Sequence, residues 1–287
     1  MSSPLIQWYP GHISKAEKAL KEQLKRVDVV LEVRDARIPL VTQHPQMPDW
    51  VGSKAKVLVL NRVDMISASA RQLWADWFYA QGEQPLFTDA QHGKGMLAVT
   101  KAAQLAGVAV NQKRRDRGML PRPVRAVVIG FPNVGKSALI NRLLGKRVVE
   151  SARRAGVTKQ LRWVRISEEI ELLDAPGVIP SKLEQQEAAI KLAICEDIGE
   201  AAYNNQRIAV ELIELLSYLD ATSDGLVSLD CLESRYGIPV GEMTGEDYLA
   251  RLGSDRCQGD IERAARQLLN DFRKGVLGAI SLELPPP

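Results

Sequence analysis

The feature that most constrains this chain is the octapeptide GFPNVGKS at residues 130–137, which fits the phosphate-binding pattern GxxxxGKS. An apolar run typical of a buried strand, Val124–Ile129, precedes it, and a helix-like segment, Ala138–Leu144, follows. A strand, loop and helix in this order turn backbone N–H groups and the helix N-terminus toward phosphate oxygens. The octapeptide therefore predicts a nucleotide-binding loop in an α/β fold.

Two side chains of this loop have chemistry that suits a nucleotide with its metal ion. We expect Lys136 to bridge β- and γ-phosphate oxygens and the Ser137 hydroxyl to ligate Mg²⁺. The rest of the expected phosphate cradle consists of Asn133, Val134, Gly135 and Ala138.

The tetrapeptide Asn61-Arg62-Val63-Asp64, after the expected strand Lys56–Leu60, resembles the guanine motif N-K-x-D. In that motif the aspartate accepts hydrogen bonds from the ring N1–H and the exocyclic amine, a donor pair that adenine lacks, so Asp64 favours GTP. Arg62 replaces the usual lysine, and its planar fork could stack on the base. Asp89-Ala90, after a short strand at Pro85–Phe87, is expected to back this motif, although a serine is more usual than Ala90.

Two later segments resemble the switch elements of a GTPase. Asp174 begins Asp-Ala-Pro-Gly after the expected strand Ile170–Leu173, and we expect it to hold Mg²⁺ through a water molecule. Gly177 would read the γ-phosphate through its N–H. Thr158 is the candidate switch threonine that closes on Mg²⁺, with an ordinary loop threonine as the alternative.

In a Ras-like GTPase the phosphate loop comes before the guanine motif. Here the guanine motif precedes the phosphate loop, so the order of the motifs is circularly permuted. Strands that alternate with helices predict a Ras-like, mostly parallel sheet, and helix-like patterns follow from about residue 184. We therefore expect an α/β, circularly permuted P-loop GTPase domain followed by a smaller, all-helical C-terminal domain. The expected divisions are a domain over 1–180, with an N-terminal segment and helix over 1–26 and a basic linker over 111–123, and a helical domain over 181–287.

With the permuted order, three further segments make the chain resemble the ribosome biogenesis GTPase A family, the YlqF/RbgA group. They are QWYPGH at 7–12, DARIP at 35–39 and DFRKG at 271–275. The resemblance implies a GTPase switch in late maturation of the large ribosomal subunit, with turnover stimulated by the ribosomal particle. The implied partners are the large-subunit precursor, its rRNA and its ribosomal proteins, with the helical C-terminal domain touching rRNA.

Charge is distributed unevenly along the chain. Residues 112–165 carry 15 Lys and Arg against 2 Asp and Glu, whereas residues 166–287 carry 10 against 23. The basic stretch suits a polyanion such as RNA, with a solvated linker as the alternative reading. Because the C-terminal region is acidic, any RNA face there should be local, and our candidates are Arg263, Arg266, Arg273 and Lys274.

Ras-like enzymes place a water-orienting glutamine after the D-x-x-G glycine, but Val178 stands here. We hypothesise that His12 supplies the missing group, with a structural anchor for the N-terminal segment as the alternative. His44 and His92 are interpreted as surface residues. Asn133 resembles an asparagine that coordinates K⁺ in related GTPases, and bracing of the loop is its alternative role.

The remaining patterns favour a cytoplasmic, monomeric protein. No apolar stretch has the length of a membrane span, and the start of the chain does not resemble a signal peptide. Cys195, Cys231 and Cys257 are too scattered for a zinc site. Two other functions stay open: a non-catalytic RNA-binding scaffold that senses GTP, and a phosphotransferase that acts on a small molecule.

Overall fold

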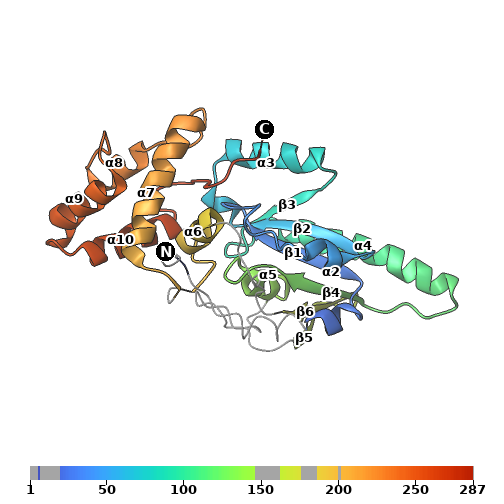
Figure 1. The fold of residues 1–287 in the computed structure, drawn as a ribbon. Coiled ribbons are helices and arrows are strands. Elements are labelled where there is room, and N and C mark those ends of the chain that lie inside the picture. Colours follow the sequence, from blue (N-terminus) through green and yellow to red (C-terminus); the bar gives the residue numbers. More distant parts are fainter. Residues whose placement is uncertain (1–5, 7–19, 146–161, 176–185, 200–201, 287) are drawn as a thin grey trace. The chain divides into compact units, whose positions relative to one another are not determined.

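The computed structural model describes residues 6, 20–145, 162–175, 186–199 and 202–286 (Figure 1). The chain clusters into two compact units. The sheet unit comprises residues 9–63 and 75–182, and the helical unit comprises residues 1–8, 64–74 and 183–287. Among the described residues, no helix combines the length and the apolar character that crossing a membrane requires.

The sheet unit is built on six strands in the order β3-β2-β1-β4-β6-β5. Every neighbouring pair is parallel except β5 and β6. All seven residues of β1 are buried, as expected for a central strand of a parallel sheet with both faces covered. The predicted mostly parallel sheet is therefore confirmed. The strands are β1 (Val29–Asp35), β2 (Ala55–Asn61), β3 (Pro85–Thr88), β4 (Val124–Ile129), β5 (Arg162–Arg165) and β6 (Ile170–Asp174).

One face of this sheet is covered by residues that precede β2. Residues 20–24 are helical, which agrees with the helix expected before β1, and α2 (Met47–Val51) lies nearby in the chain. Leu20, Leu24 and Trp50 are buried in one hydrophobic cluster with side chains of β1, β4 and β6. The sheet members of that cluster are Val30, Val127, Ile129 and Leu173.

Helix α4 (Met96–Asp116) contacts strands β1 to β4, and α5 (Lys136–Leu143) contacts α4 and β6 (Figure 1). The first six residues of the expected linker, 111–116, belong to α4, so the linker begins later than predicted. Gln112 and the basic run that follows it are good helix formers, and cations at the last turn favour the negative end of the helix dipole. The basic composition of residues 111–116 led to the prediction of a loop, but the helix propensity of these residues keeps them in α4.

The helical unit contains five helices among the described residues 186–199 and 202–286: α6 (Gln186–Ile194), α7 (Asn205–Thr222), α8 (Asp230–Tyr236), α9 (Gly245–Cys257) and α10 (Ile261–Arg273). Helices α7, α9 and α10 pack against one another. The side chains of Asn204, Thr244 and Asp260 each accept a backbone N–H at the start of a helix, and these caps fix where α7, α9 and α10 begin. The helix-like region expected from about residue 184 thus begins with two separate helices, α6 and α7.

Arg273 does not belong on an RNA-binding face. Its guanidinium is buried and donates to the carbonyl oxygens of Ala193 and Ile194, both at 2.9 Å, and to the Tyr203 hydroxyl at 2.8 Å. These carbonyls end α6 and have no partner within that helix. The suggestion of Arg273 as an RNA contact is therefore wrong, whereas Arg263, Arg266 and Lys274 stay candidates.

Candidate nucleotide-binding site

The carboxyl ends of the parallel strands bring the predicted motifs to one edge of the sheet. Asp35 ends β1 and pairs in register with Asn61, which ends β2 and pairs with Thr88 at the end of β3. Strand β4 lies beside β1 and leads into the phosphate loop at residue 130. In open α/β sheets this edge is where nucleotides bind.

The phosphate loop closes around the ammonium group of Lys136. Lys136 is buried, and its Nζ donates to the carbonyl oxygens of Gly130 at 3.1 Å and Phe131 at 2.6 Å. Glycine is required at 130 because a Cβ there would overlap the carbonyl oxygen of Val33. Gly135 has a φ of +100°, a backbone conformation that favours glycine. The loop therefore approaches the end of β1 closely and presents its lysine at a fixed place.

Asn61 joins three loops at this edge. Its Nδ2 donates to the carbonyl oxygen of Val134 in the phosphate loop at 2.8 Å. Its Oδ1 accepts from the Thr88 hydroxyl at 3.1 Å and from the Ala90 N–H at 3.0 Å. The structure thus brings the start of the expected guanine motif, the phosphate loop and the Asp89-Ala90 loop together, although they lie 29 to 73 residues apart in sequence.

Arg62 also contacts the phosphate loop. Its terminal nitrogen donates to the carbonyl oxygen of Asn133 at 2.6 Å, and its Nε lies 3.6 Å from an oxygen of Asp35. Both Arg62 and Asn133 have left-handed backbones, with φ of 64° and 56°. In this structure the arginine fork is therefore directed to the loop backbone, and its stacking on a base stays a prediction.

Asp35 and Arg37 form a buried ion pair that the motif search did not assign to the site. Arg37 donates to Asp35 through Nε at 3.0 Å and through a terminal nitrogen at 2.7 Å, and both side chains are fully buried. Burial alone would raise the pKa of Asp35. The charges of Arg37 and Arg62 together lower it by more than burial raises it, so the pKa of Asp35 lies below the ordinary value. The available signal was a polar side chain at the carboxyl end of a buried strand, as at Asn61.

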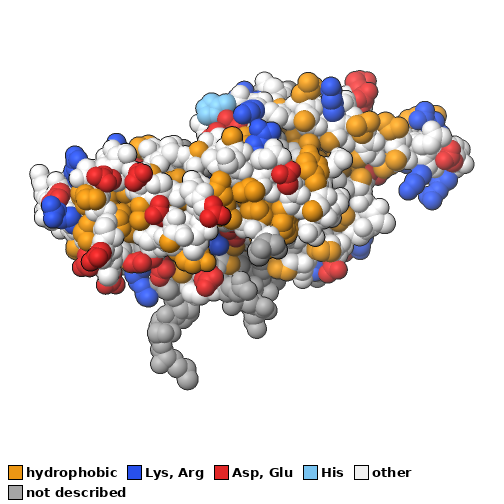
Figure 2. All heavy atoms as spheres, turned by 90° about the horizontal axis from the view of Figure 1, so that it is seen from above, with side chains coloured by type: hydrophobic (Ala, Val, Ile, Leu, Met, Phe, Trp, Pro, Cys, Tyr) orange, Lys and Arg blue, Asp and Glu red, His pale blue; other side chains and the backbone are white. Residues whose placement is uncertain are grey.

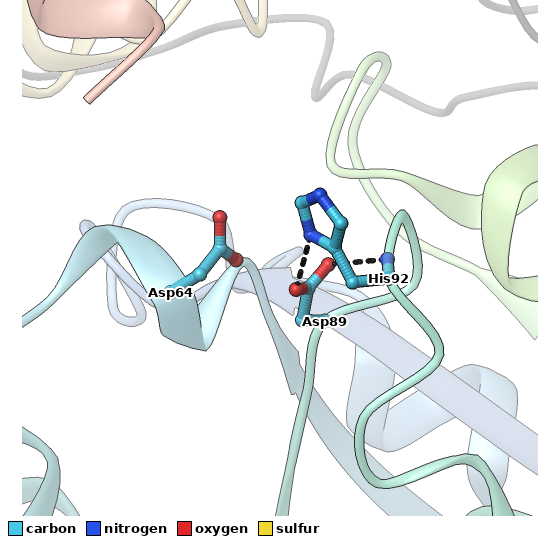
Figure 3. A group of neighbouring side chains, drawn as sticks. All are labelled: Asp64, Asp89 and His92. Atoms are coloured by element: carbon cyan, nitrogen blue, oxygen red, sulfur yellow. Dashed lines mark hydrogen bonds and ion pairs between the residues drawn. The ribbon is translucent and has the colours of Figure 1, made fainter. Parts of the chain in front are cut away.

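Asp64 lies on the short turn η2 (Val63–Met65) and is exposed (Figure 3). It follows Asn61 by three residues, so its Cα lies within about 11 Å of the Asn61 Cα. In the next loop, Asp89 accepts the His92 N–H at 3.0 Å, and its other oxygen lies 2.6 Å from His92 Nδ1 (Figure 3).

His92 has 68% of its side chain exposed, as predicted for a surface residue. The same prediction for His44 is wrong, because His44 is buried and its ring stacks on Trp50 with centroids 4.2 Å apart. Trp50 belongs to the cluster beneath the sheet, and no local pattern around His44 indicates that long-range contact.

The metal-binding predictions are only partly covered by the structure. Ser137 and Ala138 lie in the first turn of α5, and Val134 lies in the loop before Gly135. Asp174 ends β6, at the carboxyl edge that also holds the phosphate loop. A serine hydroxyl at this edge suits Mg²⁺, which prefers oxygen ligands, and the role of Asp174 in holding the ion stays a prediction. His12, Thr158, Gly177 and Val178 lie outside the described residues.

Comparison with known proteins extends this picture. A family model described as "50S ribosome-binding GTPase" matches residues 125–221. Ribosome biogenesis GTPase A of Priestia megaterium is 38% identical, over 98% of this chain and 97% of that protein. Its namesake in Bacillus licheniformis is 36% identical, over 98% of this chain and 99% of that protein.

Among solved structures, the crystal structure of GNP-bound YlqF from Thermotoga maritima matches with a TM-score of 0.66 at 24% identity. The match covers 94% of this chain and 98% of that chain. It confirms the predicted fold class. The permuted order is also evident in the sheet, where three strands precede the strand that leads into the phosphate loop.

Proposed function

Since this chain belongs to the ribosome biogenesis GTPase A family, we propose that it binds GTP at the carboxyl edge of its sheet and hydrolyses it to drive assembly of the large ribosomal subunit. One observation carries the proposal for the site itself: Asn61 and Arg62 donate hydrogen bonds to the carbonyl oxygens of Val134 and Asn133. This contact supports the proposal that the segment beginning at Asn61 and the phosphate loop bind the same nucleotide.

In this proposal different residues bind the base, the phosphates and the metal ion of GTP. Asp64 accepts the N1–H and amine of guanine, and the phosphate loop with Lys136 holds the phosphates. Mg²⁺ would be held by Ser137 and Thr158, with Asp174 acting through water, and it would neutralise charge on the phosphates. Gly177 would sense the γ-phosphate through its backbone N–H.

Hydrolysis needs a group that positions the attacking water, and Val178 offers neither a donor nor an acceptor. His12 is our candidate, and K⁺ held by Asn133 would supply positive charge near the transferred phosphoryl group. The carbonyl oxygen of Asn133 accepts a hydrogen bond from Arg62, which holds the backbone of this residue in place. Slow turnover until a partner completes the site is the behaviour expected of an assembly switch.

The proposed partner is a late precursor of the large ribosomal subunit, through its rRNA and ribosomal proteins. The relatives' names refer to ribosome biogenesis, and the matching family model refers to 50S binding. The basic stretch 112–165 adds the charge that an RNA surface requires. We propose that the protein acts as a monomer in the cytoplasm.

The decisive experiment measures binding and hydrolysis of GTP and ATP with and without large subunits. We expect GTP-selective binding and hydrolysis that large subunits stimulate. Equal binding of ATP would contradict the guanine assignment, and GTP binding without any hydrolysis would favour the GTP-sensing scaffold. The variant Asp64→Asn should shift preference from guanine to xanthine nucleotides, because an amide donor matches the xanthine C2 carbonyl.

The same assay separates the two hypotheses about the water and the cation. His12→Ala should reduce stimulated turnover while GTP affinity is retained, and unchanged turnover would remove His12 from the mechanism. Replacing K⁺ by Na⁺ should slow hydrolysis, whereas equal rates would leave Asn133 only the loop-bracing role.

A further inference from the structure

Helix α4 extends beyond the sheet at the edge opposite the phosphate loop. It starts after β3, at the carboxyl edge, and by Gly107 it has reached Val124, the first residue of β4 (Figure 1). Nine further residues continue the helix to Asp116, a distance of about 14 Å at 1.5 Å per residue. The C-terminal end of α4 therefore extends past the edge of the sheet.

The projecting end and the loop that follows, residues 112–122, are called the α4 tip here. Lys113, Arg115 and Arg117 are exposed, and no described carboxylate pairs with them. The one acidic residue of the tip, Asp116, accepts a hydrogen bond from Gln112 at 2.9 Å. Figure 2 shows Lys and Arg side chains gathered at this end of the molecule.

The α4 tip is held in one shape by its own hydrogen bonds. Asn111 exchanges two of them with the backbone of Arg122, at 3.0 and 3.1 Å. Arg114 donates to the carbonyl oxygen of Leu120 at 3.0 Å, while Arg122 forms a two-nitrogen ion pair with Asp28. A charged surface that is already ordered loses little conformational freedom on binding.

Stabilisation of the helix end explains only part of this charge. The negative end of a helix dipole amounts to roughly half an elementary charge and favours one nearby cation by up to about 1 kcal/mol at an exposed site. The final carbonyls are also already used, because those of Arg114 and Arg115 accept the N–H groups of the next residues. Three uncompensated cations exceed what the helix needs, so a polyanionic partner accounts for them better.

We propose that the α4 tip docks on the phosphate backbone of paired RNA. This proposal deepens the proposed function by naming a part of the sheet unit that contacts rRNA, and it rests on that function for the source of the RNA. Residues 112–122 include no aromatic side chain on which an unpaired base could stack. The contact is therefore electrostatic and independent of sequence. It lies at the sheet edge opposite the phosphate loop.

The test uses the full chain and a 20-base-pair RNA duplex as the probe. The tip variant combines Lys113→Gln, Arg115→Gln and Arg117→Gln. The matched control combines Lys25→Gln, Lys54→Gln and Lys101→Gln, which removes the same charge elsewhere on the sheet unit. We expect the tip variant to lose about tenfold or more in RNA affinity, and its plot of log affinity against log salt to become shallower by roughly 2 to 3.

Equal losses in the two variants would show that only net charge matters and would overturn the proposal. It would also be overturned if the tip variant kept its RNA affinity but lost binding to large subunits, because the partner would then be a protein. GTP hydrolysis of the tip variant should stay at the wild-type rate. If no variant hydrolyses GTP while the selective RNA loss is seen, the proposed enzymatic function fails and the docking surface stands.

Discussion

At the scale of single residues, Asp35 decides how two arginines are placed at the edge of the sheet. It holds Arg37 through two hydrogen bonds and lies 3.6 Å from Arg62, which in turn donates to the phosphate loop. The buried carboxylate of Asp35 supplies a counter-charge to the buried guanidinium of Arg37 and also lies near the partly exposed one of Arg62. Asp35 thus helps to position Arg62 beside the phosphate loop.

We predict that Asp35→Asn lowers the free energy of unfolding by about 3–5 kcal/mol at neutral pH, because it breaks the fully buried ion pair between Asp35 and Arg37. The folded-state pKa of Asp35 is lowered, so its contribution is complete above the unfolded carboxyl pKa of about 3.9 and is lost as the pH falls through the folded value. Denaturant unfolding of wild type and variant from pH 7 to pH 2 measures this.

The difference between the two proteins should stay constant down to about pH 4 and shrink below it. The exposed Asp49 serves as the control, since Asp49→Asn should change stability by less than about 0.5 kcal/mol. A difference that grows on acidification would show that Asp35 is not held in its charged form.

At the scale of elements, the packing of α4 on β4 depends on Gly107. A glycine inside a helix usually costs about 1 kcal/mol relative to alanine, so Gly107→Ala should stabilise an exposed helix. Here a Cβ would overlap Cγ2 of Val124, whose branched side chain has little room to rotate. We predict that Gly107→Ala destabilises the protein by about 1–2 kcal/mol, since overpacking outweighs helix propensity. Thermal unfolding measures the outcome.

The double variant with Val124→Ala provides the matched control. Once Val124 is shortened, the added methyl group has space, and Gly107→Ala should then stabilise the protein by up to about 1 kcal/mol relative to Val124→Ala alone. If Gly107→Ala is stabilising on its own, the close approach of α4 and β4 is not the constraint described here.

Elements with a strong local pattern were predictable from sequence, and those decided by distant contacts were not. The apolar run Val124–Ile129 coincides with β4, and the contact between the 61–64 segment and the phosphate loop follows from the parallel arrangement of strands. Helix α8 is only seven residues long, too short for a period to be evident. The burial of His44 and Arg273 depends on partners elsewhere in the chain, Trp50 and the end of α6.

At the scale of the whole molecule, the chain passes between its two units in the middle of the expected guanine motif. Asn61, Arg62 and Val63 belong to the sheet unit, whereas Asp64 begins the segment 64–74 of the helical unit. Within the helical unit, Trp74 is fully buried and its Nε1 donates to the carbonyl oxygen of Glu283 at 3.3 Å. The four residues of the expected guanine motif are therefore divided between the two units along the chain.

We predict that GTP protects backbone amides of both units from hydrogen exchange, and that ATP does not. A ligand at a hundred times its dissociation constant stabilises the residues it holds by about 2.7 kcal/mol, which slows exchange through their opening about a hundredfold. The protected set should include the phosphate loop and the segment 64–74. In Asp64→Asn, GTP analogues should still protect the phosphate loop but no longer the segment 64–74. Protection confined to the sheet unit in the wild type would contradict the assignment of Asp64 as the residue that reads the base.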